Sequence, residues 1–326
     1  MIDLLRPLIA ATKTIQGEMG KCFSAYPAGM PWTVVSDYSI GDEKKHNDTF
    51  SFVVVANHDT AANICEYIAA TAPRDLKNVR EVPIGLVQYL TCPVPVTFSV
   101  SFVIERRSQL LRDYLRAEDM ASFIPDVRDF VMTLQRNSPP SESVSASYFT
   151  DVLKRLTIFE RDLVRKQPNA RLARQIHLAS AFTATLFFLI SGATKPGFLR
   201  WISDRDKLIE HNETIAYDLA YLYFILMQST VSEPSSSSSE TGVLQVPKIT
   251  FELPEKTGKY RFDELIRLPD YLAGTLADIS LVDMSYTKAK FGKVLQQVFV
   301  DSPNNWVVTL GSDGEKISVR GARFHT

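Results

Sequence analysis

The alternation of apolar and polar residues predicts three β-strands in the first third of the chain. The clearest pattern runs from Val96 to Ile104, where apolar residues occupy every second position, as in a strand with one buried face. Two further apolar runs, residues 31–37 and 49–56, flank the polar turn GDEKKHND and are typical of a hairpin. Residues 1–18 and 60–71 have apolar residues at helical spacing. This part of the sequence therefore predicts mixed α and β structure.

The middle of the chain is predicted to be almost entirely helical, from Glu105 to about Ala193. A Ser/Pro-rich segment at 136–147 and Pro168 divide it. Its most apolar stretch, Ile176 to Ala193, is barely long enough to span a bilayer and contains His177 with several Ser and Thr residues. We therefore expect a buried helix in the core of a soluble protein, and no membrane span.

Strands and helices are predicted to alternate in the last third of the chain. The expected elements are a strand at 198–203, a helix from 204 to about 228, a strand at 248–253, a helix from 262 to about 283 and a β-hairpin at 306–320. The Ser-rich segment 232–241 is predicted to be a disordered loop. The core then reads strand, strand, strand, helical region, strand, helix, strand, helix.

Composition and charge indicate an ordinary globular protein. A formal net charge of −1 in 326 residues excludes a wholly basic nucleic-acid-binding surface, so any such binding would need a local patch. Cys22, Cys65 and Cys92 are odd in number and widely spaced, which suits a reducing compartment and predicts neither a disulfide framework nor a zinc site. The first residues break their apolar run at Arg6-Pro7 and lack a clean cleavage site, so we expect no signal peptide and a cytoplasmic location.

Three aspartates are candidates for a metal site, two at the ends of predicted strands and one in a predicted helix. Asp37 ends the first apolar strand, Asp204 follows the fourth, and Asp270 lies in the last helix. Hard divalent cations prefer oxygen ligands, and two Mg²⁺ ions about 4 Å apart can activate water and stabilise a leaving oxygen. A fourth carboxylate is expected in such a site, and Asp206 or Glu105 is the candidate.

This order of elements and aspartates resembles the ribonuclease-H-like superfamily, in which strand one, strand four and the final helix each supply a metal-binding carboxylate. Within it, the chain looks most like a widespread bacterial group of uncharacterised domains that closes with the helix motif Ala-Asp-x-x-Ala-Gly. Residues 269–274, PDYLAG, match that motif except at the first position. Residues 37–40, DYSI, keep the Asp and Ser of the group's usual Asp-Glu-Ser-Gly but lack its Glu and Gly.

The resemblance implies an α/β fold with a mixed five-stranded sheet, a large helical insertion and a C-terminal β-hairpin. The implied units are a core at 1–106 and 196–288, an insertion at 107–195 and an appendage at 289–326. It also implies a Mg²⁺- or Mn²⁺-dependent nuclease with metal held by Asp37, Asp204 and Asp270. The alternative is a catalytically inactive binding or scaffold protein of a bacterial defence or mobile-element system, which the incomplete first motif favours.

Each aspartate also has a purely structural interpretation. Asp37 would end a strand in a turn, and Ser203 with Asp206, or Asp204 itself, would cap the helix that follows. Asp270 directly follows Pro269, so it would be an early helical carboxylate that faces the positive helix end.

A basic stretch at 154–174 bears on partners, because it holds seven cationic and two acidic residues. The residues proposed to contact nucleic-acid phosphates are Arg161, Arg165, Lys166, Arg171 and Arg174. The alternative is a solvated helix face, and a protein partner is also open. The sequence contains no P-loop, nucleophile elbow, zinc-ligand spacing or dinucleotide fingerprint.

Overall fold

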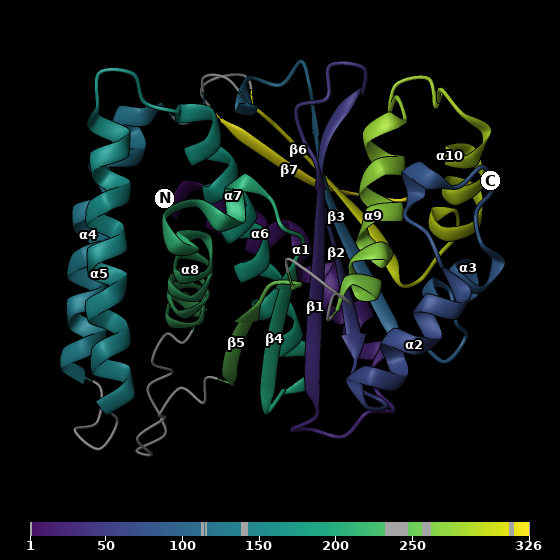
Figure 1. Ribbon diagram of the computed structural model, residues 1–326, viewed down its shortest axis with the longest axis horizontal. Helices are drawn as coiled ribbons and strands as arrows, with labels where there is room; N and C mark the ends of the chain where they lie inside the picture. The colour runs from purple at the N-terminus through teal and green to yellow at the C-terminus, as the bar shows by residue number, and fades with distance from the viewer. Residues whose placement is uncertain are drawn as a thin grey trace.

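A seven-stranded mixed sheet with helices on both faces forms the centre of the molecule (Figure 1). The computed structural model describes residues 2–111, 114, 116–137, 143–231, 247–255, 262–312 and 316–325. The strands are β1 (Pro31–Ser39), β2 (Asn47–Ala56), β3 (Thr97–Glu105), β4 (Phe198–Ser203), β5 (Lys248–Glu252), β6 (Asn305–Ser312) and β7 (Ile317–Ala322). The predicted α/β class is confirmed.

Most helices of the described residues lie in the connections between these strands. The α-helices are α1 (Ile2–Cys22), α2 (Ala61–Thr71), α3 (Ile84–Leu90), α4 (Ala117–Asn137), α5 (Ser143–Val164), α6 (Ala170–Thr194), α7 (Lys207–Glu210), α8 (Ile215–Val231), α9 (Asp263–Asp278) and α10 (Ala289–Val294). The short turns are the 3₁₀ segments η1 (Leu76–Asn78), η2 (Gln109–Leu111) and η3 (His211–Glu213) and the π-helical η4 (Leu295–Phe299).

The strand order is β5-β4-β1-β2-β3-β6-β7. β2 is antiparallel to β1 and β3, whereas β4 is parallel to β1, β5 to β4, and β6 to β3. The carboxyl ends of β1, β3, β4, β5 and β6 therefore lie at one edge of the sheet. The sheet has seven strands and not the predicted five, because the β6–β7 hairpin pairs with β3 and extends the sheet.

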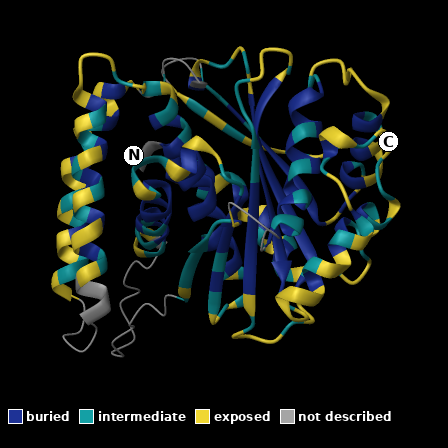
Figure 2. Cartoon of the chain, in the orientation of Figure 1, coloured by how far each residue is buried: buried dark blue, intermediate teal, exposed yellow. Residues whose placement is uncertain are grey.

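The two faces of the sheet bury different sets of side chains, because successive residues of a strand point to opposite faces. On one face α1, α6 and α8 cover residues such as Phe50 and Phe102, and Phe182 of α6 stacks on Phe102 at 4.1 Å between ring centroids. On the other face α9, with α2, α3 and α10, covers Val35 and Ile202. The central strands β2 and β3 are almost completely buried, whereas the outer strands β5 and β7 are not (Figure 2).

Helix α6 is the predicted apolar helix, and it lies in the core. It is the one helix among the described residues that is long and apolar enough to cross a membrane, yet 83% of its apolar window is buried inside the protein. His177 of α6 forms a hydrogen bond with Tyr223 of α8, with 2.8 Å between His177 Nδ1 and the tyrosine hydroxyl oxygen. α6 contacts both α1 and α8, whereas α4 and α5 pair with each other farther out (Figure 1). This burial makes α6 a core helix of a globular domain. The division of the chain at 107–195 remains a prediction.

Two helix predictions are wrong in their bounds. The helix expected from 204 to 228 is broken between α7 and α8, because Asn212, Glu213 and Thr214 have left-handed φ angles of 44°, 53° and 69°. The last predicted helix ends at Asp278 instead of 283. The predicted disordered loop at 232–241 lies outside the described residues, as do 138–142 and 313–315.

Candidate functional site

Asp37 and Asp204 lie at the carboxyl ends of the neighbouring parallel strands β1 and β4. Asp37 is inside β1, two residues before its end, so it is not a turn residue. Asp204 directly follows β4, and its backbone N–H donates a 3.0 Å hydrogen bond to the Ser36 carbonyl oxygen. By strand alternation Asp37 and Asp204 face the same side as Val35 and Ile202, whose side chains pack in the core under α9.

Asp270 is supplied by α9, which packs across β1 and β2. Both Asp270 and Pro269 lie in the interior of α9, so the interpretation of Asp270 as an early helical residue is wrong. Asp270 Oδ2 accepts a 2.7 Å hydrogen bond from the backbone N–H of Leu76 in η1. One turn later, a Cβ on Gly274 would lie 2.6 Å from Leu76 Cδ2. Two residues of the closing motif therefore contact η1: Asp270 through a hydrogen bond, and Gly274 because it has no side chain to collide with Leu76.

The pKa of each of the three carboxyl groups is raised, and two of the groups are affected by the charge of another. Burial raises the pKa of Asp37 well above its usual value, and the negative charges of Asp270 and Asp204 raise it further. Burial also raises the pKa of Asp204. Burial raises the pKa of Asp270 to about 6, with contributions from the charges of Asp75 and Asp204. Ionising all three groups together is therefore unfavourable unless a cation neutralises them.

The donor chemistry of this cluster fits a hard divalent cation, because all three side chains offer carboxylate oxygens. Two of the side chains are engaged by backbone N–H groups, Asp270 by Leu76 and Asp204 by Arg205 at 2.8 Å. Among the described residues, no group of three or more His, Cys, Asp or Glu side chains is arranged to hold a metal ion. As their side chains stand, Asp37, Asp204 and Asp270 are therefore not arranged as a set of metal ligands.

Asp206 has a structural role that the sequence left open. It is the N-cap of α7, and its side chain accepts a 2.9 Å hydrogen bond from the backbone N–H of Leu208. Its charge nevertheless raises the pKa of Asp37 and of Asp204, so it lies in the same electrostatic cluster.

Glu105 lies apart from this cluster. The sheet register aligns Asp37 with Ser51 of β2 and Ser51 with Ser101 of β3. Glu105 is four residues farther along β3, which is about 13 Å at the usual rise of a strand. It is also exposed. Glu105 is therefore poorly placed to share a cation with Asp37.

The predicted basic stretch is divided between two helices and partly neutralised. Arg155 forms a 2.6 Å ion pair with buried Asp218, so it is not available to an external partner. Arg161 lies on α5, and Arg165 lines a small pocket with Asp162, its neighbour at 3.9 Å.

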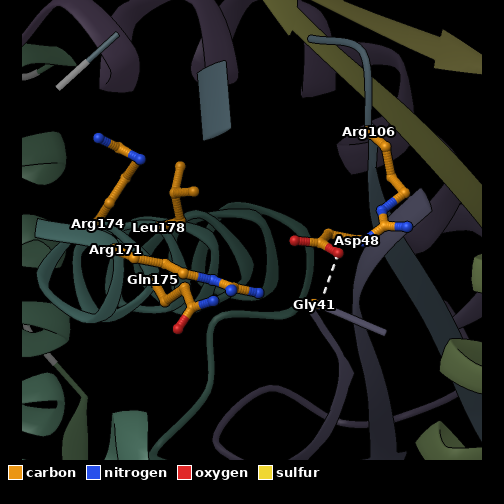
Figure 3. Close-up of a pocket in the computed structure, with 7 residues that line it drawn as sticks. All are labelled: Gly41, Asp48, Arg106, Arg171, Arg174, Gln175 and Leu178. Carbon is orange, nitrogen blue, oxygen red and sulfur yellow. Dashed lines mark hydrogen bonds between the residues drawn. The ribbon is translucent and has the colours of Figure 1, made fainter. Parts of the chain in front are cut away.

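Only part of the basic stretch converges. Lys166 is exposed in the turn before α6. Arg171 and Arg174 of α6 line one pocket together with Arg106, which follows β3 (Figure 3).

Two loops that the sequence analysis did not connect with α9 fix the position of this helix. On the segment 72–79, backbone carbonyls accept hydrogen bonds of 2.9 and 3.0 Å from Arg267 and Tyr271. The same segment brings Asp75 close enough for its charge to raise the pKa of Asp270. No periodicity marks these residues, so sequence patterns could not have found them.

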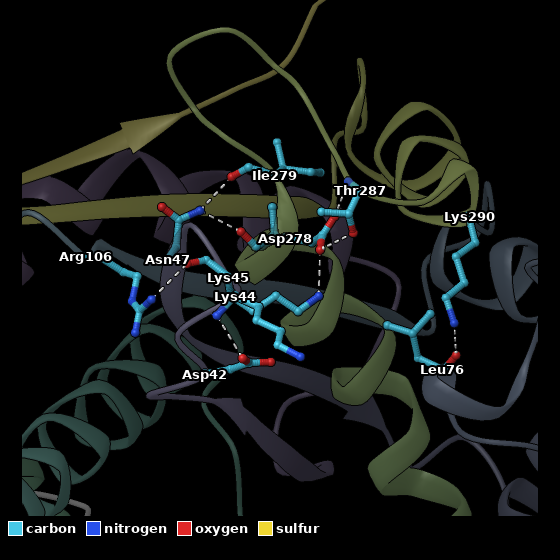
Figure 4. A network of polar contacts seen from close by, with 11 residues as sticks. Asp42, Lys44, Lys45, Asn47, Leu76, Arg106, Asp278, Ile279, Thr287 and Lys290 are labelled. Atoms are coloured by element: carbon cyan, nitrogen blue, oxygen red, sulfur yellow. Dashed lines mark hydrogen bonds and ion pairs between the residues drawn. The ribbon is translucent and has the colours of Figure 1, made fainter.

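The β1–β2 loop holds the other end of α9 (Figure 4). Asn47 donates hydrogen bonds of 2.8 and 2.7 Å to two backbone carbonyls at the end of α9. Lys45 forms a 2.7 Å ion pair with Asp278, which also accepts two hydrogen bonds from Thr287. Burial opposes ionisation of Asp278, but the hydrogen bonds from Lys45 and Thr287 hold its pKa below the usual value. α9 is thus anchored at both ends, which fixes Asp270 relative to the sheet.

The candidate metal site consists of Asp37, Asp204 and Asp270. Strand pairing places Asp37 beside Asp204, α9 packs across β1 with Asp270, and each of the three carboxyl groups has a raised pKa. Comparisons with protein-family models, with curated proteins and with solved structures gave no match.

Proposed function

We propose that the protein is a metal-dependent nuclease with a ribonuclease-H-like core, and that Asp37, Asp204 and Asp270 form its site. The observation that carries the proposal is that carboxyl groups from the first strand, the fourth strand and the last long helix all have raised pKa values, and that the charges of Asp204 and Asp270 both act on Asp37. The strand order supports it as well. Three antiparallel strands, β1 to β3, are followed by β4 and β5, which lie parallel to β1 on its other side and are reached through helices.

In this proposal Asp37 and Asp204 would hold Mg²⁺ or Mn²⁺ at the edge of the sheet, with Asp270 completing the ligand set from α9. A bound divalent cation supplies Lewis acidity that activates water and stabilises a leaving oxygen. The protein contributes position: β1–β4 pairing sets the spacing of Asp37 and Asp204, and the two anchoring loops set Asp270. Asp270 Oδ2 accepts the N–H of Leu76, which leaves Oδ1 for the cation.

A specific observation favours the alternative, a catalytically inactive binding or scaffold protein. Asp204 and Asp270 already accept backbone hydrogen bonds, and the described residues hold no group arranged for a metal ion. In that case Asp270 would serve as the acceptor that fixes η1 on α9. The bacterial defence or mobile-element setting belongs to this alternative.

The decisive experiment is a cleavage assay on single- and double-stranded DNA and RNA with Mg²⁺, with Mn²⁺ and with EDTA. Asp37→Asn, Asp204→Asn and Asp270→Asn should each abolish metal-dependent cleavage. Asp126→Asn, on the exposed face of α4, is the matched control and should cleave like the wild type. The scaffold alternative is favoured if the wild-type protein cleaves none of these substrates and if neither metal changes its melting temperature.

A further inference from the structure

A second candidate site lies on the face of the sheet opposite to the aspartates. It is a pocket of about 230 Å³ between the start of α6 and the β1–β2 loop (Figure 3). Asp48 of β2 lines it and points to the α6 face, because it shares the alternation of Phe50, whose ring contacts Phe182 of α6. Asp37 points to the α9 face. The pocket is therefore separate from the proposed nuclease site.

Cationic groups dominate the lining of this pocket. Among the described residues, the charged side chains that line it are Arg106, Arg171, Arg174 and Asp48, which together carry a formal net charge of +2. Arg174 is only 5% exposed. Among the described residues, the Arg171 guanidinium makes no hydrogen bond and no ion pair. Arg106 Nη1 donates to two carbonyl oxygens of the β1–β2 loop, and its remaining guanidinium donors have no partner among the described residues.

Arg171 lies against the loop around Gly41. Gly41 has a left-handed φ of +75°, and its backbone N–H donates a 2.8 Å hydrogen bond to Asp48 Oδ1. A Cβ at Gly41 would lie 1.9 Å from Arg171 Nη2, so the guanidinium lies directly against the glycine. The absence of a side chain at Gly41 thus leaves room for the planar fork of guanidinium donors in the pocket.

We propose that this pocket binds the phosphate group of a phosphate monoester, carried by a nucleotide or by the phosphorylated end of an oligonucleotide. Arginine binds phosphate through two parallel hydrogen bonds, and a lining charge of +2 matches a phosphate dianion. Pockets that enclose drug-sized ligands are about 300–1,000 Å³. The smaller volume here suits the phosphate and the atoms next to it, with the rest of the ligand outside. The inference holds whether or not the protein is a nuclease.

Isothermal titration calorimetry of the full chain in EDTA tests this, because metal-dependent chemistry is then absent. The probes are inorganic phosphate, adenosine 5′-monophosphate against adenosine, and one oligonucleotide with a 5′-phosphate against the same with a 5′-hydroxyl. Wild type should bind the phosphorylated member of each pair and not the other. A preference seen only with the oligonucleotide identifies a nucleic-acid end as the ligand, and one seen only with the mononucleotide identifies a nucleotide.

Three variants make the test specific. Arg171→Gln should weaken binding about ten- to a hundred-fold, the range for losing a charged hydrogen bond. Lys166→Gln removes the same charge from an exposed position outside the pocket and should change affinity less than about two-fold, as expected for an unpaired surface charge. Asp48→Asn keeps an acceptor for the Gly41 N–H and removes the negative charge, so it should tighten binding. Thermal melting confirms that each variant is folded.

Several results would overturn the proposal. These are equal binding of phosphorylated and unphosphorylated probes, no binding of any probe, or equal losses in Arg171→Gln and Lys166→Gln. Weaker binding by a folded Asp48→Asn would also overturn it, because it would indicate a cationic ligand. Asp270→Asn should bind phosphate like the wild type, so failure of the nuclease proposal leaves this result unaffected.

Discussion

Replacing Asp270 with Asn should stabilise the metal-free protein at neutral pH, because it removes a buried charge while nearly keeping the shape of the side chain. The pKa of Asp270 is raised from 3.8 to about 6 by burial and by the charges of Asp75 and Asp204. A carboxyl group with a raised pKa holds its proton more tightly in the folded state, so its ionisation opposes folding. At 1.36 kcal/mol per pKa unit, this difference is roughly 3 kcal/mol once the pH exceeds 6. The penalty disappears as the pH falls from 6 toward 4.

One contribution works against this gain. Asp270 accepts the backbone N–H of Leu76, which favours the ionised carboxylate, and the pKa of about 6 already includes this effect. We therefore expect a stabilisation of roughly 2–3 kcal/mol at pH 7.5 and little or none at pH 4. The size of the effect therefore depends on pH, because the buried carboxyl group is ionised at pH 7.5 and protonated at pH 4.

Urea unfolding in EDTA at pH 7.5 and pH 4 measures both values, with Asp126→Asn as a control that should stay within about 0.5 kcal/mol of the wild type. The reasoning is refuted if Asp270→Asn is less stable than the wild type at pH 7.5. Such a result would mean that the hydrogen bond to η1 outweighs the cost of the buried charge.

The other predictions concern packing, a buried ion pair and metal binding. Gly274→Ala places a Cβ 2.6 Å from a leucine side chain and should lower the free energy of unfolding by about 1–3 kcal/mol. Gly17→Ala, in open space on α1, should raise the free energy of unfolding by about 0.5–1 kcal/mol. Urea unfolding measures both changes. Asp218→Ala leaves Arg155 without its 2.6 Å partner and should cost about 3–5 kcal/mol by the same method. Mn²⁺ should raise the melting temperature of the wild type but not of Asp37→Asn, and an equal rise in both would exclude Asp37 as a ligand.

The elements that sequence patterns predicted well are those whose burial leaves a regular trace. The predicted strand Val96–Ile104 agrees within one residue with β3, Thr97–Glu105, because alternate apolar positions report directly on a packed strand. The helix predicted from 204 to 228 failed because its break lies at Asn212–Thr214. Those residues have left-handed backbone conformations without a glycine or proline to signal them.

The candidate site was predicted in part for a similar reason. Asp37 and Asp204 stand at strand ends, which hydrophobic runs locate, and Asp270 belongs to a short motif. The bonds of Asp270 to Leu76 and of Arg155 to Asp218 join residues 194 and 63 positions apart. Contacts between such distant residues depend on the tertiary fold, and local patterns carry no information about them. Counting the charges at 154–174 therefore gave more cationic side chains available to an external partner than the structure has, because Arg155 is paired with Asp218.

The pairing of β3 with β6 has a consequence for how the chain folds. Ser99 of β3 lies opposite Asn305, so the edge of β3 stays uncovered until more than 200 further residues have been synthesised. Contacts between such distant segments form slowly, and an open strand edge invites pairing with other chains. Because Phe102 and Ile104 lie in this strand, a chain that ends before β6 should aggregate during expression. The hairpin thus protects the newly made protein as well as widening its sheet.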